Sequence, residues 1–124
     1  MRHKESEEMY LETILLLQRN TGYVRSVDIA TELGYSKASV SRAMKILLTK
    51  EYITIGKHGE ILLTEAGQAK AEKVYKTHRI IMELLMRIGA DEALAEENAC
   101  RIEHVISDEL LELIKKHLTN IKPC

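Results

Sequence analysis

The chain has 124 residues, of which 45% are hydrophobic and 30% charged, and its formal net charge is −1. This length can bury one sizeable core with an appended element, but it leaves no room for two large unrelated domains. No apolar run approaches the roughly 20 residues of a membrane span, and the N-terminus is too charged for a signal peptide. We therefore expect a cytoplasmic protein without membrane contact. Cys100 and Cys124 form no paired motif, which argues against a disulfide framework.

Charge is distributed unevenly along the chain. Residues 34–60 carry five basic and two acidic side chains, whereas residues 91–114 carry eight carboxylates and one arginine. A basic segment suits a polyanion such as DNA. An acidic segment suits cations, or it is simply a solvated helical surface. The two segments therefore point to two different charged partners.

The first third of the chain reads as three helices. Ser6 can cap a first helix whose apolar residues recur at helical spacing to about Arg19. A second, short helix begins around Ser26 and is stopped by Gly34. Ser36 then caps a third helix with one buried face. Two short helices joined by a tight turn that contains glycine form a helix-turn-helix.

A change of pattern follows, from helical spacing to β-branched residues. Residues 52–55 and 61–64 flank a glycine-bounded turn, which predicts the two strands of a wing. A long helix is expected over residues 64–88, followed by a helix capped by Asp91 and a last one capped by Ser107. The expected fold is mainly α with a small β-wing: a winged helix-turn-helix over residues 1–64 and an α-helical region over residues 65–124.

The start of the third helix has the composition of a DNA-reading surface. In a helix-turn-helix this segment approaches base edges, while short polar groups hold phosphates. Arg42 can bond guanine through two hydrogen bonds, and Lys37 or Lys45 can meet phosphate. The alternative is a winged helix used for protein contacts, in which the serines serve only as caps. The predicted DNA-binding residues are Ser36, Lys37, Ala38, Ser39, Ser41, Arg42 and Lys45, with Lys57 and His58 at the tip of the wing.

A second constellation points to a metal. Cys100, Glu103 and His104 stand at i, i+3 and i+4, which would place them on one face of a helix. Thiolate, carboxylate and imidazole suit ferrous iron, cobalt, nickel or zinc better than magnesium or calcium. Met9 and Glu12 share a face of the first helix and would add donors if that helix docks across the others. The alternative is a solvated Glu–His pair beside a small core cysteine.

The sequence resembles the diphtheria toxin repressor family of iron- and manganese-dependent repressors. The similarity extends over nearly the whole chain and is carried by residues 8–14, the helix-turn-helix, the His78–Arg79 pair and above all ACRIEHVISDE at residues 99–109. It implies a winged helix followed by a helical dimerisation and metal-binding region. It also implies that the metal-loaded protein is the form that binds an operator. Larger members carry a C-terminal SH3-like domain, and we expect a short form without it.

The resemblance also assigns candidate ligands. Four residues match the activating site of the iron-responsive members: Met9, Cys100, Glu103 and His104. His78 matches a ligand of a neighbouring second site. Iron-type members have a carboxylate and a histidine where this chain has Met82 and Glu96, although Glu96 would still offer an oxygen. Glu12 resembles a ligand of the manganese-responsive branch, so the sequence mixes both branches.

These observations predict a metal-dependent transcriptional repressor rather than an enzyme. Ferrous iron ranks ahead of manganese because sulfur ligands favour it, and zinc, cobalt or nickel would act as surrogates. The expected partners are a palindromic double-stranded DNA operator of metal-uptake genes and a second copy of the chain. The alternative is a winged-helix regulator that responds to a small organic ligand. A metallo-hydrolase is disfavoured because the chain has no HExxH motif and no glycine-rich phosphate loop.

Overall fold

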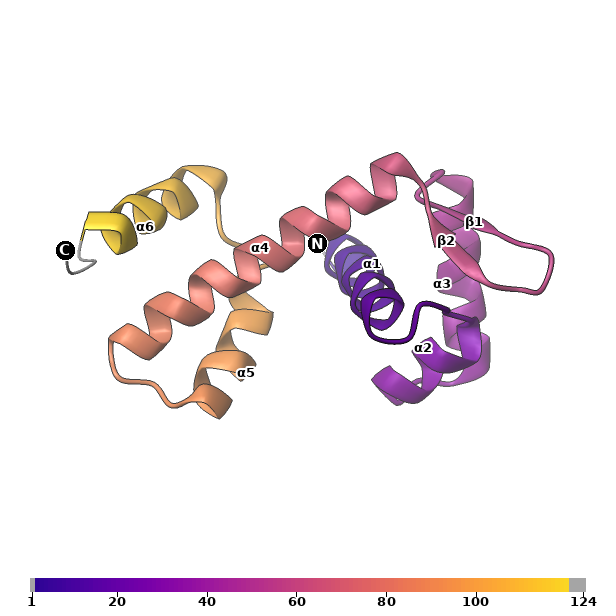
Figure 1. Cartoon of the computed structure of the whole chain (residues 1–124), viewed down its shortest axis with the longest axis horizontal. Coiled ribbons are helices and arrows are strands. Elements are labelled where there is room, and N and C mark those ends of the chain that lie inside the picture. Colours follow the sequence, from indigo (N-terminus) through magenta and orange to yellow (C-terminus); the bar gives the residue numbers. More distant parts are fainter. Residues whose placement is uncertain (1, 121–124) are drawn as a thin grey trace. The chain divides into compact units, whose positions relative to one another are not determined.

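A computed structural model describes residues 2–120, with side chains described for residues 7–119, so Cys124 lies outside it. The described chain forms six helices and one two-stranded antiparallel sheet (Figure 1). It divides into two compact units, unit 1 at Met1–Glu72 and unit 2 at Lys73–Cys124. The division falls inside the fourth helix, whereas the predicted domain boundary after residue 64 lies at the start of that helix and stays a prediction. No helix in the described range has the length and apolarity needed to cross a membrane.

Unit 1 begins with α1 (Arg2–Thr21), which starts earlier than the sequence pattern predicted. Ser6 lies inside this helix, so its assignment as the cap was wrong. The residues before Ser6 include arginine, lysine and glutamate, which are good helix formers and allow the helix to extend past a possible capping serine. Leu11, Ile14 and Leu15 on α1 are buried in the core of the unit.

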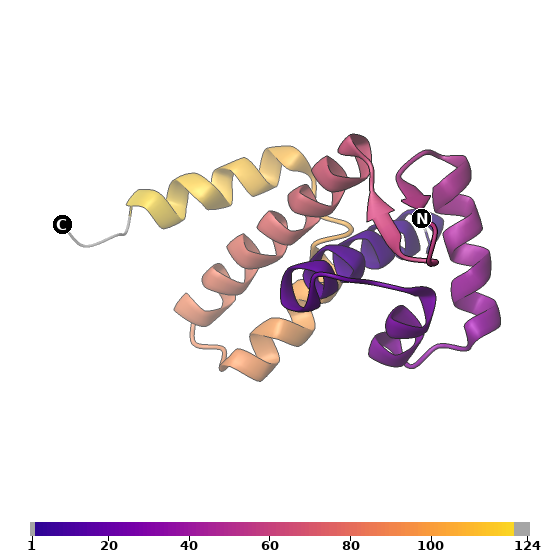
Figure 2. The ribbon, with the colours of Figure 1, turned by 45° about the vertical axis from the view of Figure 1, so that its right-hand side comes forward.

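The helix-turn-helix consists of α2 (Ser26–Leu33) and α3 (Lys37–Thr49), shown in Figures 1 and 2. Gly34 ends α2 at φ +71°, a left-handed conformation that glycine adopts without strain. Ser36 caps α3, since its Oγ accepts the Ser39 N–H at 3.1 Å, which confirms the predicted cap. At the start of α2 the cap residue is Arg25, whose N–H donates to Asp28 Oδ2 at 2.8 Å.

The wing consists of β1 (Ile53–Ile55) and β2 (Ile61–Leu63), paired antiparallel with Ile53 opposite Leu63. The N–H of Ile61 donates to Val24 O at 2.7 Å and ties the hairpin to the α1–α2 loop. Behind the hairpin, a Cβ atom at Gly67 would lie 2.0 Å from the Tyr52 carbonyl oxygen. Only glycine therefore allows the following helix to start so close to the backbone at Tyr52.

Unit 2 contains the C-terminal part of α4 (Glu65–Arg87), α5 (Glu92–Ile102) and α6 (Asp108–Asn120). Its core contains Ile81, Ala99 and Leu111, one from each helix. Asp91 caps α5 by accepting the Leu94 N–H at 2.8 Å, and Ser107 accepts the Leu110 N–H at 3.2 Å at the start of α6. Both predicted caps are therefore confirmed.

The end of α5 differs from the prediction. The helix ends at Ile102, Glu103 is its C-cap, and His104 lies in the following turn. Cys100, Glu103 and His104 therefore do not share one continuous helical face as their spacing suggested. The turn is closed by the N–H groups of Val105 and Ile106, which both donate to Ile102 O at 3.0 Å.

Candidate metal centre and DNA-reading surface

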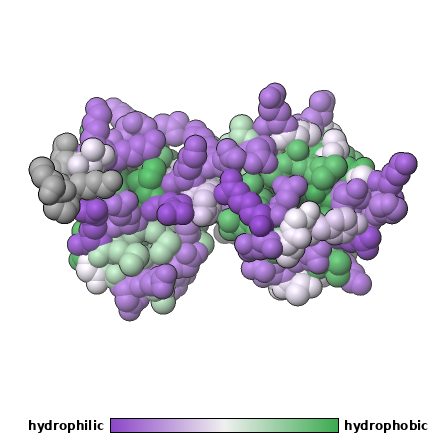
Figure 3. Space-filling view, in the orientation of Figure 1, coloured by the Kyte–Doolittle hydropathy of each residue, from purple (hydrophilic) through white to green (hydrophobic). Residues whose placement is uncertain are grey.

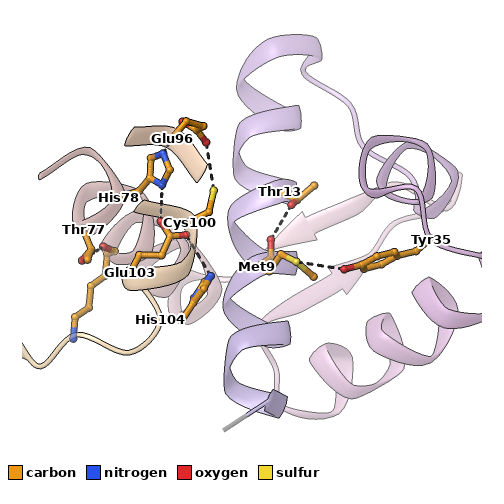
Figure 4. A network of polar contacts seen from close by, with 10 residues as sticks. Met9, Thr13, Tyr35, Thr77, His78, Glu96, Cys100, Glu103 and His104 are labelled. Atoms are coloured by element: carbon orange, nitrogen blue, oxygen red, sulfur yellow. Dashed lines mark hydrogen bonds and ion pairs between the residues drawn. The ribbon is translucent and has the colours of Figure 1, made fainter. Parts of the chain in front are cut away.

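A buried carboxylate lies at the centre of a polar network in unit 2 (Figure 4). Glu103 is 7% exposed, and its N–H donates to Ala99 O at 2.9 Å, which fixes its place at the end of α5. Its Oε1 accepts a hydrogen bond from His78 Nδ1 at 2.7 Å, and its Oε2 lies 3.3 Å from His104 Nε2. One buried carboxylate therefore contacts two imidazoles.

The network continues from His78 along α5. Nε2 of His78 lies 3.0 Å from Glu96 Oε1, and the Cys100 thiol donates to Glu96 Oε2 at 3.4 Å. Glu96 and Cys100 are both exposed, whereas His78 is buried. Five of the predicted ligands thus form one continuous series of contacts within unit 2: His104, Glu103, His78, Glu96 and Cys100.

The two carboxylates change the acid–base chemistry of His78. The hydrogen bond to Glu103 favours the charged imidazolium, burial opposes it, and the bond to Glu96 favours it again, which together raise the pKa of His78 to about 9. Without a metal, His78 is therefore protonated at neutral pH and donates a hydrogen bond to each carboxylate. Because a metal binds the neutral ring, it must displace one of these protons.

The geometry of unit 2 suits a metal with mixed ligands. Donor atoms of His78, Glu96 and Cys100 all lie within 4.8 Å of one another. They comprise an imidazole nitrogen, a carboxylate oxygen and a sulfur, a borderline-soft combination that is typical of transition-metal sites. The cluster is open to solvent through Glu96 and Cys100.

Met9 and Glu12 belong to unit 1, where both are half-buried on α1. The Tyr35 hydroxyl lies 3.8 Å from Met9 Sδ and donates to it, and the Thr13 hydroxyl donates to Met9 O at 2.8 Å. Figure 4 shows these contacts around Met9. Their expected participation in a metal shell stays a prediction.

The predicted DNA-reading residues lie at the start of α3 and at the tip of the wing. Ser39 is half-buried, and its Oγ lies 3.0 Å from Ser36 Oγ and 3.4 Å from Arg42 Nη2. These contacts hold Arg42 along the first turns of the helix. The other predicted residues are all exposed: Ser36, Lys37, Ala38, Ser41, Arg42, Lys45, Lys57 and His58.

Comparison with known proteins identifies both halves of the chain. Residues 3–60 match the N-terminal DNA-binding domain of iron-dependent repressors, and residues 64–124 match their metal-binding and dimerisation domain. An uncharacterised HTH-type transcriptional regulator of Methanocaldococcus jannaschii, MJ0568, is 33% identical over 120 residues, which cover 95% of this chain and 96% of that protein. The chain belongs to the iron-dependent repressor family.

Other members of the iron-dependent repressor family are similar over most of the chain. The transcriptional regulator MntR of Escherichia coli O157:H7 is 30% identical over 112 residues, which cover 90% of this chain and 72% of MntR. The solved structure of the manganese regulator SloR superposes with a TM-score of 0.82 at 31% identity and covers 95% of this chain. The chain spans only 55% of the SloR chain. These matches establish a metal-dependent transcriptional repressor with DNA-binding and dimerisation domains, from a family of regulators rather than enzymes.

The surface of unit 2 is consistent with a dimerisation domain. Most of the surface seen in Figure 3 is hydrophilic, interrupted by hydrophobic patches. The exposed large hydrophobic side chains of unit 2 are Met86, Ile88, Leu94, Val105, Leu110 and Leu113. The sequence predicts an apolar excess on the last two helices, carried by Leu94, Ile102, Val105, Leu110, Leu111 and Ile114. Of these, Leu94, Val105 and Leu110 are exposed, Ile102 and Ile114 are half-buried, and Leu111 is buried. An apolar surface of this kind is typical of a protein interface.

Sequence reasoning missed an ion-pair cluster in unit 1 that is centred on a buried glutamate. Glu7 on α1 is 8% exposed and pairs with Lys50 at the end of α3 and with Lys70 Nζ at 3.3 Å. Burial opposes ionisation of Glu7, but the hydrogen bonds to both lysines outweigh it, so that the pKa of Glu7 lies below its usual value. The three residues are far apart in sequence and form no local pattern, so no signal in the sequence could have found them.

Proposed function

We propose that this repressor binds the operators of metal-uptake genes when it is loaded with ferrous iron, or alternatively with manganese. The observation that carries the proposal is the nitrogen, oxygen and sulfur donors of His78, Glu96 and Cys100 within 4.8 Å of one another. These donors belong to the segment that matches the family's metal-binding domain. Because the protein acts on chromosomal DNA, we place it in the cytoplasm.

The proposed ligands come from three helices and one turn. Unit 2 would supply His78 from α4, Glu96 and Cys100 from α5, and Glu103 and His104 from the end of α5. Met9 and Glu12 would supply further donors from α1. Their support is their i, i+3 spacing on α1 and their match to ligand positions of the family.

The ligand set also bears on whether the sensed metal is ferrous iron or manganese. The sulfur atoms of Cys100 and Met9 favour ferrous iron over manganese because manganese prefers oxygen ligands. SloR is described as a manganese regulator, and Glu12 is a carboxylate of the kind that manganese prefers. Iron therefore leads on the chemistry of the ligands, and manganese is the principal competitor.

The proposed mechanism couples this site to DNA reading. In the proposed mechanism, the carboxylates of the ligand set would repel one another without a metal, and α1 would be loosely held. A bound divalent ion would supply the positive charge that removes this repulsion. The chain's own ligands would then hold the arrangement in which the α3 helices of a homodimer lie about 34 Å apart, one DNA turn, which predicts a palindromic operator. A coupling free energy of about 1–3 kcal/mol would change DNA affinity about 5–150-fold.

The test is an anaerobic fluorescence-anisotropy titration of the protein onto DNA from its own upstream region. Ferrous iron, manganese, zinc and a chelator are compared at constant salt, because salt alone changes DNA affinity. We expect affinity to rise at least about tenfold with the sensed metal, within the range of ordinary allosteric coupling, and to return to the metal-free level with chelator. Binding that ignores every metal would contradict the proposal and direct the search to an organic effector.

A matched variant tests the DNA-reading side of the proposal. Arg42→Ala should lower operator affinity by about 1–3 kcal/mol and weaken the preference for operator over unrelated DNA, because it removes a base contact. Lys57→Ala should weaken binding to both DNAs about equally, because a phosphate contact carries no sequence information. Equal behaviour of the two variants would contradict the assignment of Arg42 as a base reader.

A further inference from the structure

We propose that Glu60 is a positioning residue for DNA binding: its carboxylate folds back over Gly56 and fixes the wing turn that presents Lys57 and His58 to DNA. The proposal rests on the proposed function, in which Lys57 and His58 contact DNA. Glu60 is absent from the predicted DNA-reading residues, and a negatively charged side chain does not attract phosphate. Its role is to hold the two residues that make the contact.

The wing turn places Lys57 and His58 at the end of the hairpin. The N–H of Gly59 donates to Gly56 O at 3.1 Å and closes a four-residue turn. Lys57 and His58 are its two central residues, and both side chains are exposed. The N–H of Gly56 donates to Glu60 O at 2.8 Å and joins the turn to the strands. The turn projects beyond β1 and β2 (Figure 1), where its side chains can meet a bound polyanion.

The Glu60 side chain returns to this turn. It is half-buried, and its Oε1 accepts the His58 N–H at 2.9 Å. The backbone N–H groups of Glu60 and His58 hold the pKa of this carboxyl below its usual value against the effect of desolvation, and the charges of His58 and Arg25 lower it further. The group is therefore an ionised carboxylate that is bonded to the backbone of a central turn residue.

Gly56 makes room for this carboxylate. A Cβ atom at Gly56 would lie 2.7 Å from Glu60 Oε1 and closer still to Oε2, and the three atoms nearest to it all belong to the Glu60 carboxyl group. Gly56 has no positive φ, so alanine could adopt its backbone conformation. The close approach of Glu60, rather than the backbone, is thus what favours glycine at this position.

The start of β2 is anchored to the helix-turn-helix next to Glu60. The N–H of Ile61 donates to Val24 O at 2.7 Å in the loop before α2, and both side chains are buried. Glu60 is the first residue of the turn beyond this anchor. By bonding to the turn, its carboxylate extends the rigid part of the wing to Lys57 and His58.

A carboxylate in the wing has two opposing effects on DNA binding. Its charge repels phosphate. Its contacts hold the turn in place, and side chains that are already held lose less conformational freedom on binding. Two variants separate these effects, because Glu60→Gln removes the charge but keeps an oxygen acceptor, whereas Glu60→Ala removes both.

The test measures the affinity of the full chain for its upstream DNA by fluorescence anisotropy, with ferrous iron and at constant salt. Glu60→Ala should weaken binding about 3–10-fold, the effect expected when one or two side chains must be ordered on binding. Glu60→Gln should bind about as tightly as Glu51→Gln, a control that removes the same charge from an exposed position before the wing.

Gly56→Ala tests the same contact from its other side. Since the added methyl group would push the Glu60 carboxylate out of the turn, this variant should weaken DNA binding about as much as Glu60→Ala. The double variant should be no weaker than either single variant, because both remove one contact. Lys57→Ala should reduce affinity in the unchanged chain and have little further effect in Glu60→Ala. A purely structural role of Glu60 would leave the effect of Lys57→Ala equal in both backgrounds.

Amide hydrogen exchange of His58, followed by NMR in the metal-free chain without DNA, reports on the turn itself. Exchange should be faster in Glu60→Ala and Gly56→Ala than in Glu60→Gln and the unchanged chain, while circular dichroism checks that each variant is folded. Tighter DNA binding by Glu60→Ala, additive losses in the double variant, or unchanged His58 exchange in Glu60→Ala would each overturn the proposal. Failure of the proposed function would appear separately, as DNA binding that ignores metal while the ranking of the wing variants persists.

Discussion

Among the side chains that the structure describes, each unit buries one glutamate, and the two glutamates have different partners. Glu7 in unit 1 is 8% exposed and Glu103 in unit 2 is 7% exposed. Glu7 pairs with the ammonium groups of Lys50 and Lys70, whereas the partners of Glu103 are the imidazoles of His78 and His104. Burial alone therefore does not distinguish the two carboxylates.

The two carboxylates differ in whether their cationic partner can give up its proton to a metal ion. A lysine ammonium keeps its proton at any physiological pH, so the charge of Glu7 is matched permanently. The positive charge of an imidazole is a proton that a metal ion can replace. We therefore expect the cluster around Glu7 to stabilise unit 1, whereas the proposed site around Glu103 would exchange protons for a metal. On this proposal, the type of partner, rather than the depth of burial, separates a structural buried carboxylate from a functional one.

Among the tests of this comparison between the two clusters, we expect the largest effect in the metal-dependent rise in DNA affinity. Cys100→Ala removes a proposed ligand at an exposed position, so the fold should survive and the metal-dependent rise in DNA affinity, about 5–150-fold, should disappear. Anisotropy titrations with and without ferrous iron measure this ratio. The control Glu83→Gln removes an exposed carboxylate of α4 that pairs with Arg87 and should keep the full response. A full response in Cys100→Ala would show that Cys100 is not a ligand.

The next effect concerns stability. Glu7→Ala leaves Lys50 and Lys70 without their shared carboxylate and should lower the free energy of unfolding by about 1–3 kcal/mol. Urea denaturation measures this loss, which metal should not restore. The exposed Glu32 on α2 provides a control, since Glu32→Ala should change stability by less than about 0.5 kcal/mol. Equal stabilities of the two variants would mean that the Glu7 cluster contributes no more than an ordinary surface ion pair.

A smaller effect is expected at alkaline pH in the metal-free protein. The pKa of His78 in the folded protein is raised from 6.5 to about 9. The contribution of His78 to the free energy of unfolding is therefore fully present below pH 6.5 and is lost as pH rises through about 9. Since relaxation and solvent reduce the effect of such a shift, we expect a loss on the order of 1–2 kcal/mol. Urea midpoints measured with chelator across this range would show it. A variant His78→Gln should lose this pH dependence, and an identical slope in the variant would refute the assignment.

The smallest effect is expected at acid pH and comes from unit 1. The pKa of Glu7 is lowered from 4.5. The contribution of Glu7 to the free energy of unfolding is therefore present above pH 4.5 and is lost as pH falls through the lowered pKa. Unfolding midpoints between pH 5 and pH 3 should therefore decline less steeply for Glu7→Gln than for the unchanged chain. Parallel declines would indicate that other carboxylates dominate acid unfolding.

Much of unit 1 could be predicted because its signals are local. Ser36 caps its own helix through a residue three positions away, and Gly34 ends α2 because its own φ is positive. Such features depend on a few neighbouring residues, which a sequence displays directly. For this reason the helix-turn-helix and the wing hairpin could be predicted from the sequence, and the structure confirms both.

The sequence singled out the residues of the polar cluster in unit 2 but not their arrangement, and their role as metal ligands stays a prediction. Spacing alone extended α5 through His104, whereas Glu103 ends the helix and turns its carboxylate toward His78, 25 residues earlier in the chain. The Glu7 cluster was not foreseen at all, because Lys50 and Lys70 lie 43 and 63 residues away. Contacts between residues so far apart in the sequence depend on how the helices pack against one another. The periodic pattern of apolar residues does not reveal this packing.

The close approach of Gly67 to the Tyr52 carbonyl also predicts which positions of the chain tolerate substitution. Gly34 requires a left-handed backbone with nothing within 4 Å of an added Cβ, so asparagine can replace it at modest cost. At Gly67 even a methyl group would meet backbone at 2.0 Å, and backbone cannot rotate aside as a side chain can. In a library randomised at both positions and selected for repression, position 34 should retain a short list of residues, while position 67 should retain glycine alone.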